Sequence, residues 1–257
     1  MVRWAVSTSI DAPQASMAGR NVANHILQNL PREENEPLCT HLEPICLRQG
    51  DVLSDLAAPI TYGYFPQCGL VTTLVVMRGG DSVEAGLLGS EGFAGLPILL
   101  NIAHSSSRFV VQIAGEAMRI KAEVLHELLP KLPMLERLLS RFGYLQALQM
   151  EQLSACNALH EVEERLARWL LMVKDRVPIE SLTLTHDQLG RMLGTRRASV
   201  SVAASVLQRL GIIDYSRGSV RILRHDKLEE VACECYDIVH TQLEAYLNTG
   251  LAARPYV

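Results

Sequence analysis

Arginine and hydroxyl side chains are concentrated between residues 185 and 224, in a pattern suited to binding anionic groups. Arginines occupy positions 191, 196, 197, 209, 217, 221 and 224, and the one acidic residue between them is Asp214. A guanidinium binds a phosphate or the acceptor edge of guanine through two parallel hydrogen bonds, and Ser and Thr hydroxyls bind phosphate oxygens. The residues that we expect to contact such a ligand are Thr185, Thr195, Arg196, Arg197, Ser199, Ser201, Arg217 and Arg221.

The local sequence predicts two helices joined by a glycine turn as the scaffold for these side chains. Thr185 and the glutamine three residues after it form a capping box, so the first helix is expected over His186–Leu193. Gly194 supplies the sharp turn, and Thr195 can cap a second helix that runs to about residue 210. The expected buried stripe of that helix consists of Val200, Ala203, Ala204, Leu207 and Leu210.

A basic hairpin is expected directly after the second helix. Residues 212–215 and 220–223 read as strands, and the tight turn at 216–219 carries Arg217. Two helices followed by such a wing have the geometry that places the second helix in the major groove of duplex DNA. The sequence therefore favours double-stranded DNA as a partner over a small helical domain with a solvated arginine face.

A strand-rich region precedes this module. Short β-prone runs alternate with glycine turns at the spacing of a sandwich or barrel, which predicts a β-roll. The expected strands cover residues 45–48, 62–65, 70–77, 82–88, 109–113 and 116–120.

A long helix is expected from about Met134, after two prolines. Its apolar stripe consists of Leu135, Leu138, Phe142, Leu145 and Leu148. On the pattern alone, packing of this stripe against the chain's own barrel is favoured over a dimer seam in a short coiled coil.

The cysteines have no framework spacing. Cys233 and Cys235 are two residues apart and could form a redox or metal-binding pair, but two ligands cannot complete a tetrahedral zinc site. Because side chains at i and i+2 of a helix point apart, buried structural cysteines are the favoured interpretation. We expect no metal and no cofactor.

Composition limits the class of protein. The 257 residues carry a net charge of −4, so any nucleic-acid contact must come from a local basic patch. The apolar runs are interrupted by polar residues, and the sparse cysteines follow no secretory signal, which favours a cytoplasmic protein that does not enter a membrane. We also find no nucleophile elbow, phosphate loop or zinc-protease motif, so catalysis is not expected.

The arrangement from about residue 22 to 240 resembles the Crp/Fnr family of regulators. The resemblance is carried by GSEGFAGLPILL at 89–100, VQIAGEAMRI at 111–120, EERLARWLLM at 163–172 and the helix-turn-helix at 184–213. It implies an α+β fold with a cyclic-nucleotide-binding-like β-roll, a long dimerisation helix and a C-terminal winged helix-turn-helix. It also raises the dimer-seam interpretation, and implies a homodimer that works with RNA polymerase. The expected divisions are a leader at 1–20, a sensor at 21–133, the dimerisation helix at 134–160, the DNA-binding domain at 161–225 and a helical extension at 226–257.

The chain departs from the family at the nucleotide pocket. Members that bind cyclic nucleotides have a glutamate and an arginine where this chain has Leu96, after Gly95, and Ser107, before Arg108. A leucine cannot pair with a buried ribose hydroxyl, so cyclic AMP is not expected to be the effector, which stays unknown. The family's iron–sulfur cysteine spacing is absent, and no haem signal is present.

The reading helix departs as well. The family's frequent arginine, glutamate and arginine readers correspond to Arg197, Ala198 and Val202, so the operator is expected to differ from the usual half-site. The competing interpretation is an effector-binding module that acts through a protein partner, with weak, salt-insensitive DNA binding.

Overall fold

The computed structural model describes residues 22–178 and 180–248. Contacts within the chain divide them into two compact units: residues 22–73, 87–146 and 244–248 form the first, and residues 74–86, 147–178 and 180–243 form the second. The expected leader at 1–20 and the end of the expected C-terminal extension, 249–257, lie outside the described residues. In the described part of the chain, no helix is long and apolar enough to cross a membrane.

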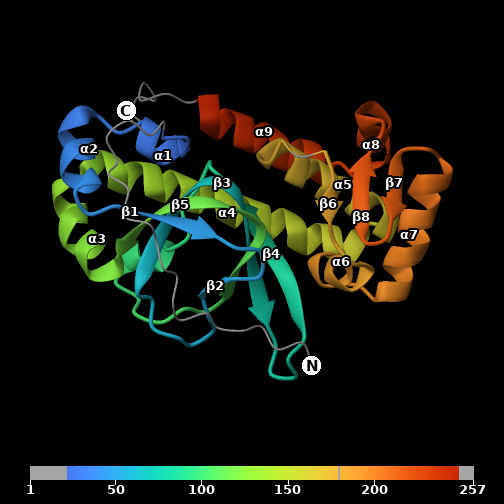
Figure 1. Ribbon diagram of the computed structural model, residues 1–257, viewed down its shortest axis with the longest axis horizontal. Helices are drawn as coiled ribbons and strands as arrows, with labels where there is room; N and C mark the ends of the chain where they lie inside the picture. Colours follow the sequence, from blue (N-terminus) through green and yellow to red (C-terminus); the bar gives the residue numbers. More distant parts are fainter. Residues whose placement is uncertain (1–21, 179, 249–257) are drawn as a thin grey trace. The chain divides into compact units, whose positions relative to one another are not determined.

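A five-stranded sheet confirms the strand-rich region that the sequence predicts (Figure 1). Its strand order is β1-β5-β3-β4, and β2 pairs with β5. The pairings of β1 and of β2 with β5 are antiparallel, with Ile45 opposite Ala117. The strands are β1 (Glu43–Leu47), β2 (Val52–Ser54), β3 (Tyr62–Val76), β4 (Ser82–Leu88) and β5 (Arg108–Lys121).

Two of the expected strand breaks are wrong, because β3 runs through Pro66 and β5 runs through Gly115. The Pro66 carbonyl accepts a hydrogen bond from the buried amide of Asn24 at 3.0 Å. A Cβ at Gly115 would lie 2.2 Å from the carbonyl oxygen of Cys68. Gly115 thus lets β5 approach the backbone of β3, so here glycine marks a close approach of two strands and not a turn.

The first unit also contains short helices. They are α1 (His25–Gln28), α2 (Arg32–Cys39), η1 (Leu96–Leu100), α3 (Ala122–Leu128) and η2 (Leu129–Lys131). Asn24 caps α1 by accepting the backbone N–H of Leu27, and its side-chain amide also donates to the Gly92 carbonyl. This fully buried asparagine therefore fixes the start of the described chain against the sheet.

The long helix α4 (Pro133–Leu159) confirms the helix expected from about residue 134. Leu135, Leu138, Phe142 and Leu145 are all at least 93% buried within the chain itself. The Phe142 ring fills the space beside Gly92, where a Cβ would be 2.1 Å from a ring carbon. Four of the five residues proposed as a dimer seam are therefore core of the first unit. Of the five residues, only Leu148 is partly exposed.

The second unit combines a helical cluster with a small sheet, β6-β8-β7 (Figure 1). Besides the end of β3, most of β4 and the C-terminal part of α4, its elements are α5 (Val162–Arg176), β6 (Leu182–Thr183), α6 (His186–Met192), α7 (Arg197–Arg209), β7 (Ile213–Ser216), β8 (Ser219–Ile222), α8 (His225–Val231) and the start of α9 (Cys235–Asn248). Helix α5 contacts both α7 and α8. Its Trp169 is fully buried, and the indole N–H donates to the buried Glu84 carboxylate of β4 at 3.1 Å.

Candidate nucleic-acid interface

The two predicted helices and their glycine turn are present in the second unit. The backbone N–H of Gln188 donates to Thr185 Oγ1 at 3.2 Å, and Gln188 Oε1 accepts the N–H of Thr185 at 2.8 Å, which confirms the capping box. Gly194 has a φ of +57°, in the region that favours glycine. The expected cap of the second helix is wrong by one residue: α7 begins at Arg197, and Arg196, not Thr195, is its N-cap.

Helix α7 has one buried face and one open face. Val200, Ala203, Ala204 and Leu207 are buried, as the apolar spacing predicts. Leu210 is 53% exposed, so its assignment to the buried stripe is wrong, because the helix ends at the residue before it. Facing outward at the start of α7 are Arg196, Arg197, Ala198 and Val202.

Some arginines of this module already form ion pairs or hydrogen bonds with other residues of the module. Arg191 is paired with Asp187, and Arg221 with Asp214 at 3.2 Å. The Arg224 guanidinium donates to the carbonyls of Leu210 and Gly211 at the end of α7. These three side chains therefore stabilise the module itself.

Three of the predicted arginines keep open guanidinium groups. Among residues 22–178 and 180–248, none forms a hydrogen bond or ion pair with the side chain of Arg196, Arg197 or Arg217. All three are exposed. Because the N-terminal end of a helix also carries partial positive charge, the first turn of α7 and its two arginines together form an exposed, positively charged surface.

The predicted hydroxyl contacts are less open than the arginines. Ser201 donates to the Arg197 carbonyl at 3.1 Å and is hydrogen-bonded to His186 Nδ1 at 2.8 Å. Burial lowers the pKa of His186, and the positive charge of Arg197 adds to the shift, so this imidazole is neutral at neutral pH. Thr185 is occupied by its capping box. Thr195 and Ser199 are half-buried beside the start of α7.

The wing is a two-residue hairpin. Arg217 and Gly218 form its tip with φ values of +49° and +77°, the signs of a type I′ turn. Tyr215 of β7 donates its hydroxyl to the Leu184 carbonyl at 2.6 Å, and its ring stacks on His186 at a centroid distance of 4.4 Å. These contacts fix the wing against α6, within the same unit.

The predicted effector pocket is nearly filled. A cavity of about 10 Å³ lies at the expected place in the first unit, and Tyr64, Gly95, Ser105 and Phe109 are among its lining residues. This volume holds about one water molecule. Leu96 lies instead 3.7 Å from the position of a Cβ on Gly143 of α4, so of the four predicted residues only Gly95 lines the cavity.

Arg108 is already paired in the first unit. Its Nε and Nη2 donate to the two carboxylate oxygens of Asp55 at 2.7 and 3.0 Å. Although burial opposes the shift, these hydrogen bonds lower the pKa of Asp55. Ser107 is hydrogen-bonded to Ser105. An arginine held this way is not free to neutralise a ligand phosphate.

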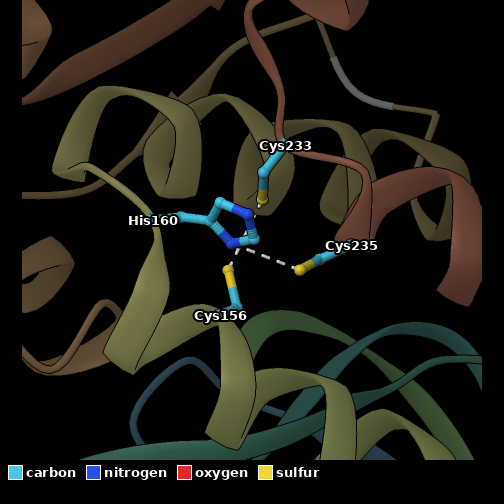
Figure 2. A group of neighbouring side chains, drawn as sticks. All are labelled: Cys156, His160, Cys233 and Cys235. Atoms are coloured by element: carbon cyan, nitrogen blue, oxygen red, sulfur yellow. Dashed lines mark hydrogen bonds between the residues drawn. The ribbon is translucent and has the colours of Figure 1, made fainter.

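A group of four side chains in the second unit was not expected as a group. Figure 2 shows Cys156, in the last turn of α4, and His160, directly after that helix, facing Cys233 and Cys235, and we call these four residues the cysteine cluster. Cys233 precedes α9 and Cys235 begins it, so the pair is not on one helix and the expectation that the two sulfurs diverge is wrong. A hydrogen bond with Cys233 is the main cause that lowers the pKa of Cys156, to about 5.

A sequence signal for this cluster was present. Cys156 and His160 are four residues apart, so they share one face of a helix. The expectation that Cys233 and Cys235 are buried is confirmed. Cys233 and Cys235 did not predict the site by themselves, because the other two donors, Cys156 and His160, lie more than seventy residues earlier in the chain.

Comparison with known proteins identifies the DNA-reading module. Residues 164–231, which contain α6, α7 and the wing, match the family of Crp-like helix-turn-helix domains. No curated protein sequence matches the chain.

Several solved structures share the fold. FixK2 from Bradyrhizobium japonicum has a TM-score of 0.64 at 17% identity, over 75% of this chain and 98% of that one. CLP, the c-di-GMP-responsive global regulator of Xanthomonas campestris, has a TM-score of 0.64 at 17% identity, over 75% and 99%. A Crp/Fnr-family transcriptional regulator from Thermus thermophilus has a TM-score of 0.60 at 21% identity, over 74% and 98%. At these identities the likeness shows the fold alone.

Proposed function

Because this chain carries a Crp-like helix-turn-helix domain and has the fold of the Crp/Fnr regulators, we propose that it is a DNA-binding transcription regulator. The observation that carries the proposal is the open start of α7, where Arg196 and Arg197 are exposed and have no partner among the described residues. Helix α7 enters the major groove with this end, and Arg197 reaches a base edge or phosphate. Arg217 at the wing tip contacts the flanking backbone.

The regulator acts as a homodimer through α4. Of the expected stripe, Leu135, Leu138, Phe142 and Leu145 are buried inside the first unit. We therefore place the seam on the face formed by Tyr144, Leu148, Glu151, Ala155 and Leu159, which are spaced by three or four residues. Tyr144 is 68% exposed and Leu159 78% exposed, so the large apolar side chains of this face are open to a partner helix. Ala155 between them lets a second helix approach closely.

DNA footprinting tests the proposed function. The purified full-length protein is incubated with genomic fragments, and protected sites are sequenced. We expect inverted repeats whose centres are about one helical turn apart, since a twofold dimer presents two α7 helices. A scrambled fragment of equal length serves as the control. Protection that is independent of sequence, or none, would contradict the proposal and favour a module that acts through a protein partner. A regulator of this kind also contacts RNA polymerase, which a pull-down with purified polymerase on the identified operator would detect.

The signal sensed by the first unit is not cyclic AMP. The cavity of about 10 Å³ is too small for a nucleotide, Leu96 offers no acceptor for a ribose hydroxyl, and Asp55 holds Arg108. We expect isothermal titration calorimetry with cyclic AMP to give no saturable heat in the micromolar range.

The Arg108→Ala variant is the control for this titration. If this variant still releases weak heat with cyclic AMP, that heat does not come from binding of the ligand phosphate by Arg108. Saturable micromolar binding by the unmodified protein, lost in Arg108→Ala, would show that the pocket opens and that the prediction is wrong.

A further inference from the structure

We propose that the cysteine cluster binds one zinc ion, held by Cys156, His160, Cys233 and Cys235 in a tetrahedral site. This inference goes beyond the proposed function and does not depend on it. The four residues belong to the second unit and come from the end of α4, from the residue directly after it, from the segment between α8 and α9, and from the first residue of α9. The three thiols are buried, and His160 is half-buried.

The spacing of the donor atoms fits a single ion. Cys156 Sγ and Cys233 Sγ are 3.5 Å apart, as are Cys235 Sγ and His160 Nδ1, and all four donor atoms lie within 4.8 Å of one another. With zinc–sulfur bonds of about 2.3 Å, the edges of a tetrahedral site are about 3.8 Å. Small side-chain movements therefore bring all four atoms to bonding distance.

His160 is oriented as a metal ligand. Its Nδ1 faces the three sulfurs, and its Nε2 lies 3.1 Å from the Glu234 carboxylate (Figure 2 shows the ring among the sulfurs). Metal-binding histidines typically donate their second ring N–H to a carboxylate, which fixes the tautomer and the ring orientation. Gln152 similarly donates its amide to Cys235 Sγ at 3.1 Å, as an outer hydrogen bond to a thiolate would.

The charge around the cluster supports an anionic site. Three thiolates and one Zn²⁺ carry a net charge of −1. Arg168 of α5 is 99% buried, its positive charge acts on Cys156 and Cys233, and its Nε and Nη2 have no hydrogen-bond partner. Among the described residues, no carboxylate pairs with Arg168 or with the neighbouring buried Arg165. A buried guanidinium without a counter-charge is costly, and a zinc–thiolate centre supplies one.

Ligand chemistry favours zinc over the alternatives. Soft thiolates with one imidazole form the usual closed, four-ligand structural zinc site. An iron–sulfur cluster needs its cysteines arranged around several iron atoms, whereas these four donors converge on one point. A disulfide between Cys156 and Cys233 would leave the orientation of His160 and the position of Arg168 unexplained.

Bound zinc would join three elements of the second unit. The ion cross-links α4 to the α8–α9 connection, and Arg168 of α5 lies beside it. Arg165, one turn before Arg168, donates to the carbonyl of Leu193, directly before the Gly194 turn. The site is thus connected to the turn of the DNA-reading helices by two neighbouring arginines on α5.

Metal binding to the full-length protein tests the inference. The protein is reduced, treated with a chelator and titrated with Zn²⁺ against a chromophoric zinc competitor, and bound metal is counted by mass spectrometry after desalting. We expect one zinc per chain. Co²⁺ in its place should give the intense visible bands of tetrahedral cobalt and a charge-transfer band from thiolate to cobalt.

Matched variants locate the site. Cys156→Ser and His160→Ala should each lower retained zinc at least about tenfold, whereas the triple variant of Cys39, Cys46 and Cys68 to serine, which changes only cysteines outside the cluster, should keep one equivalent. If Cys156→Ser fails to fold, Glu234→Gln, on an exposed side chain, remains informative. It should weaken zinc binding by about 10–100-fold through the lost orientation of His160.

Three results would overturn the inference. The first is no zinc retained by the reduced unmodified protein. The second is equal retention in the protein and in Cys156→Ser and Glu234→Gln. The third is thiol counting that finds Cys156 and Cys233 in a disulfide that persists in reductant. Because no readout involves DNA, a failure to bind zinc would leave the proposed function standing. Conversely, a protein that retains zinc but binds no operator would contradict the proposed function and not the zinc site.

Discussion

Arg197→Ala is expected to weaken operator binding by at least about 30-fold while leaving the fold intact. Each good bidentate arginine contact contributes about 1–3 kcal/mol, and a dimer loses it at two half-sites. The Arg197 side chain is exposed and has no partner among the residues that the structure describes, so its removal breaks nothing inside the protein. A mobility-shift titration on the footprinted operator measures the change.

Arg209→Ala is the matched control for this variant. Arg209 is the last residue of α7, exposed like Arg197 and about 18 Å further along the helix axis. Both variants remove one positive charge from the same helix. If the two weaken binding equally, the effect is one of net charge, and the assignment of the N-terminal end of α7 to the groove is wrong.

Trp169→Ala should cause the largest loss of stability of any single change considered. The indole is fully buried in the second unit, and truncation of such a side chain costs about 3–5 kcal/mol through lost burial and the remaining cavity. It also removes the N–H donor from the buried Glu84 carboxylate. Because whole domains are stable by about 5–15 kcal/mol, the variant should be close to unfolded. Urea denaturation followed by circular dichroism measures the loss.

Two further variants divide this effect into its parts. Trp169→Phe keeps much of the ring but removes the donor, so it should lose part of the free energy of unfolding. Ile238→Ala, at a position that is 44% exposed on α9, should change that free energy by no more than about 0.5 kcal/mol. A Trp169→Ala protein as stable as the Ile238→Ala protein would mean that the buried position of the indole is wrong.

The DNA-reading module could be predicted because its signals are local. The Thr185 cap, the Gly194 turn and the apolar spacing of α7 each lie within a few residues of the structure that they specify. Which arginines are open could not be predicted, since the pairs of Arg221 with Asp214 and of Arg224 with two carbonyls depend on how the hairpin folds back.

Non-local packing limited the remaining predictions. The apolar stripe of α4 fits both a dimer seam and a core, and only the burial of Leu135 and Phe142 decides between them. Gly115 was taken as a strand break because its close approach to Cys68 is invisible along the chain. The cysteine cluster was missed because Cys233 and Cys235 were treated as neighbours on a helix, without the pair at Cys156 and His160.

At the tip of the wing, stability and charge favour different residues at position 217. Arg217 has a φ of +49°, a conformation that costs a non-glycine residue about 1–2 kcal/mol. Glycine at this position would relieve that strain but would remove the exposed positive charge from the tip of the hairpin. Variants selected for heat resistance would therefore tend to lose Arg217, and variants selected for tight operator control would tend to keep it. The residue at this position in related proteins would therefore show whether stability or the positive charge was selected at the hairpin.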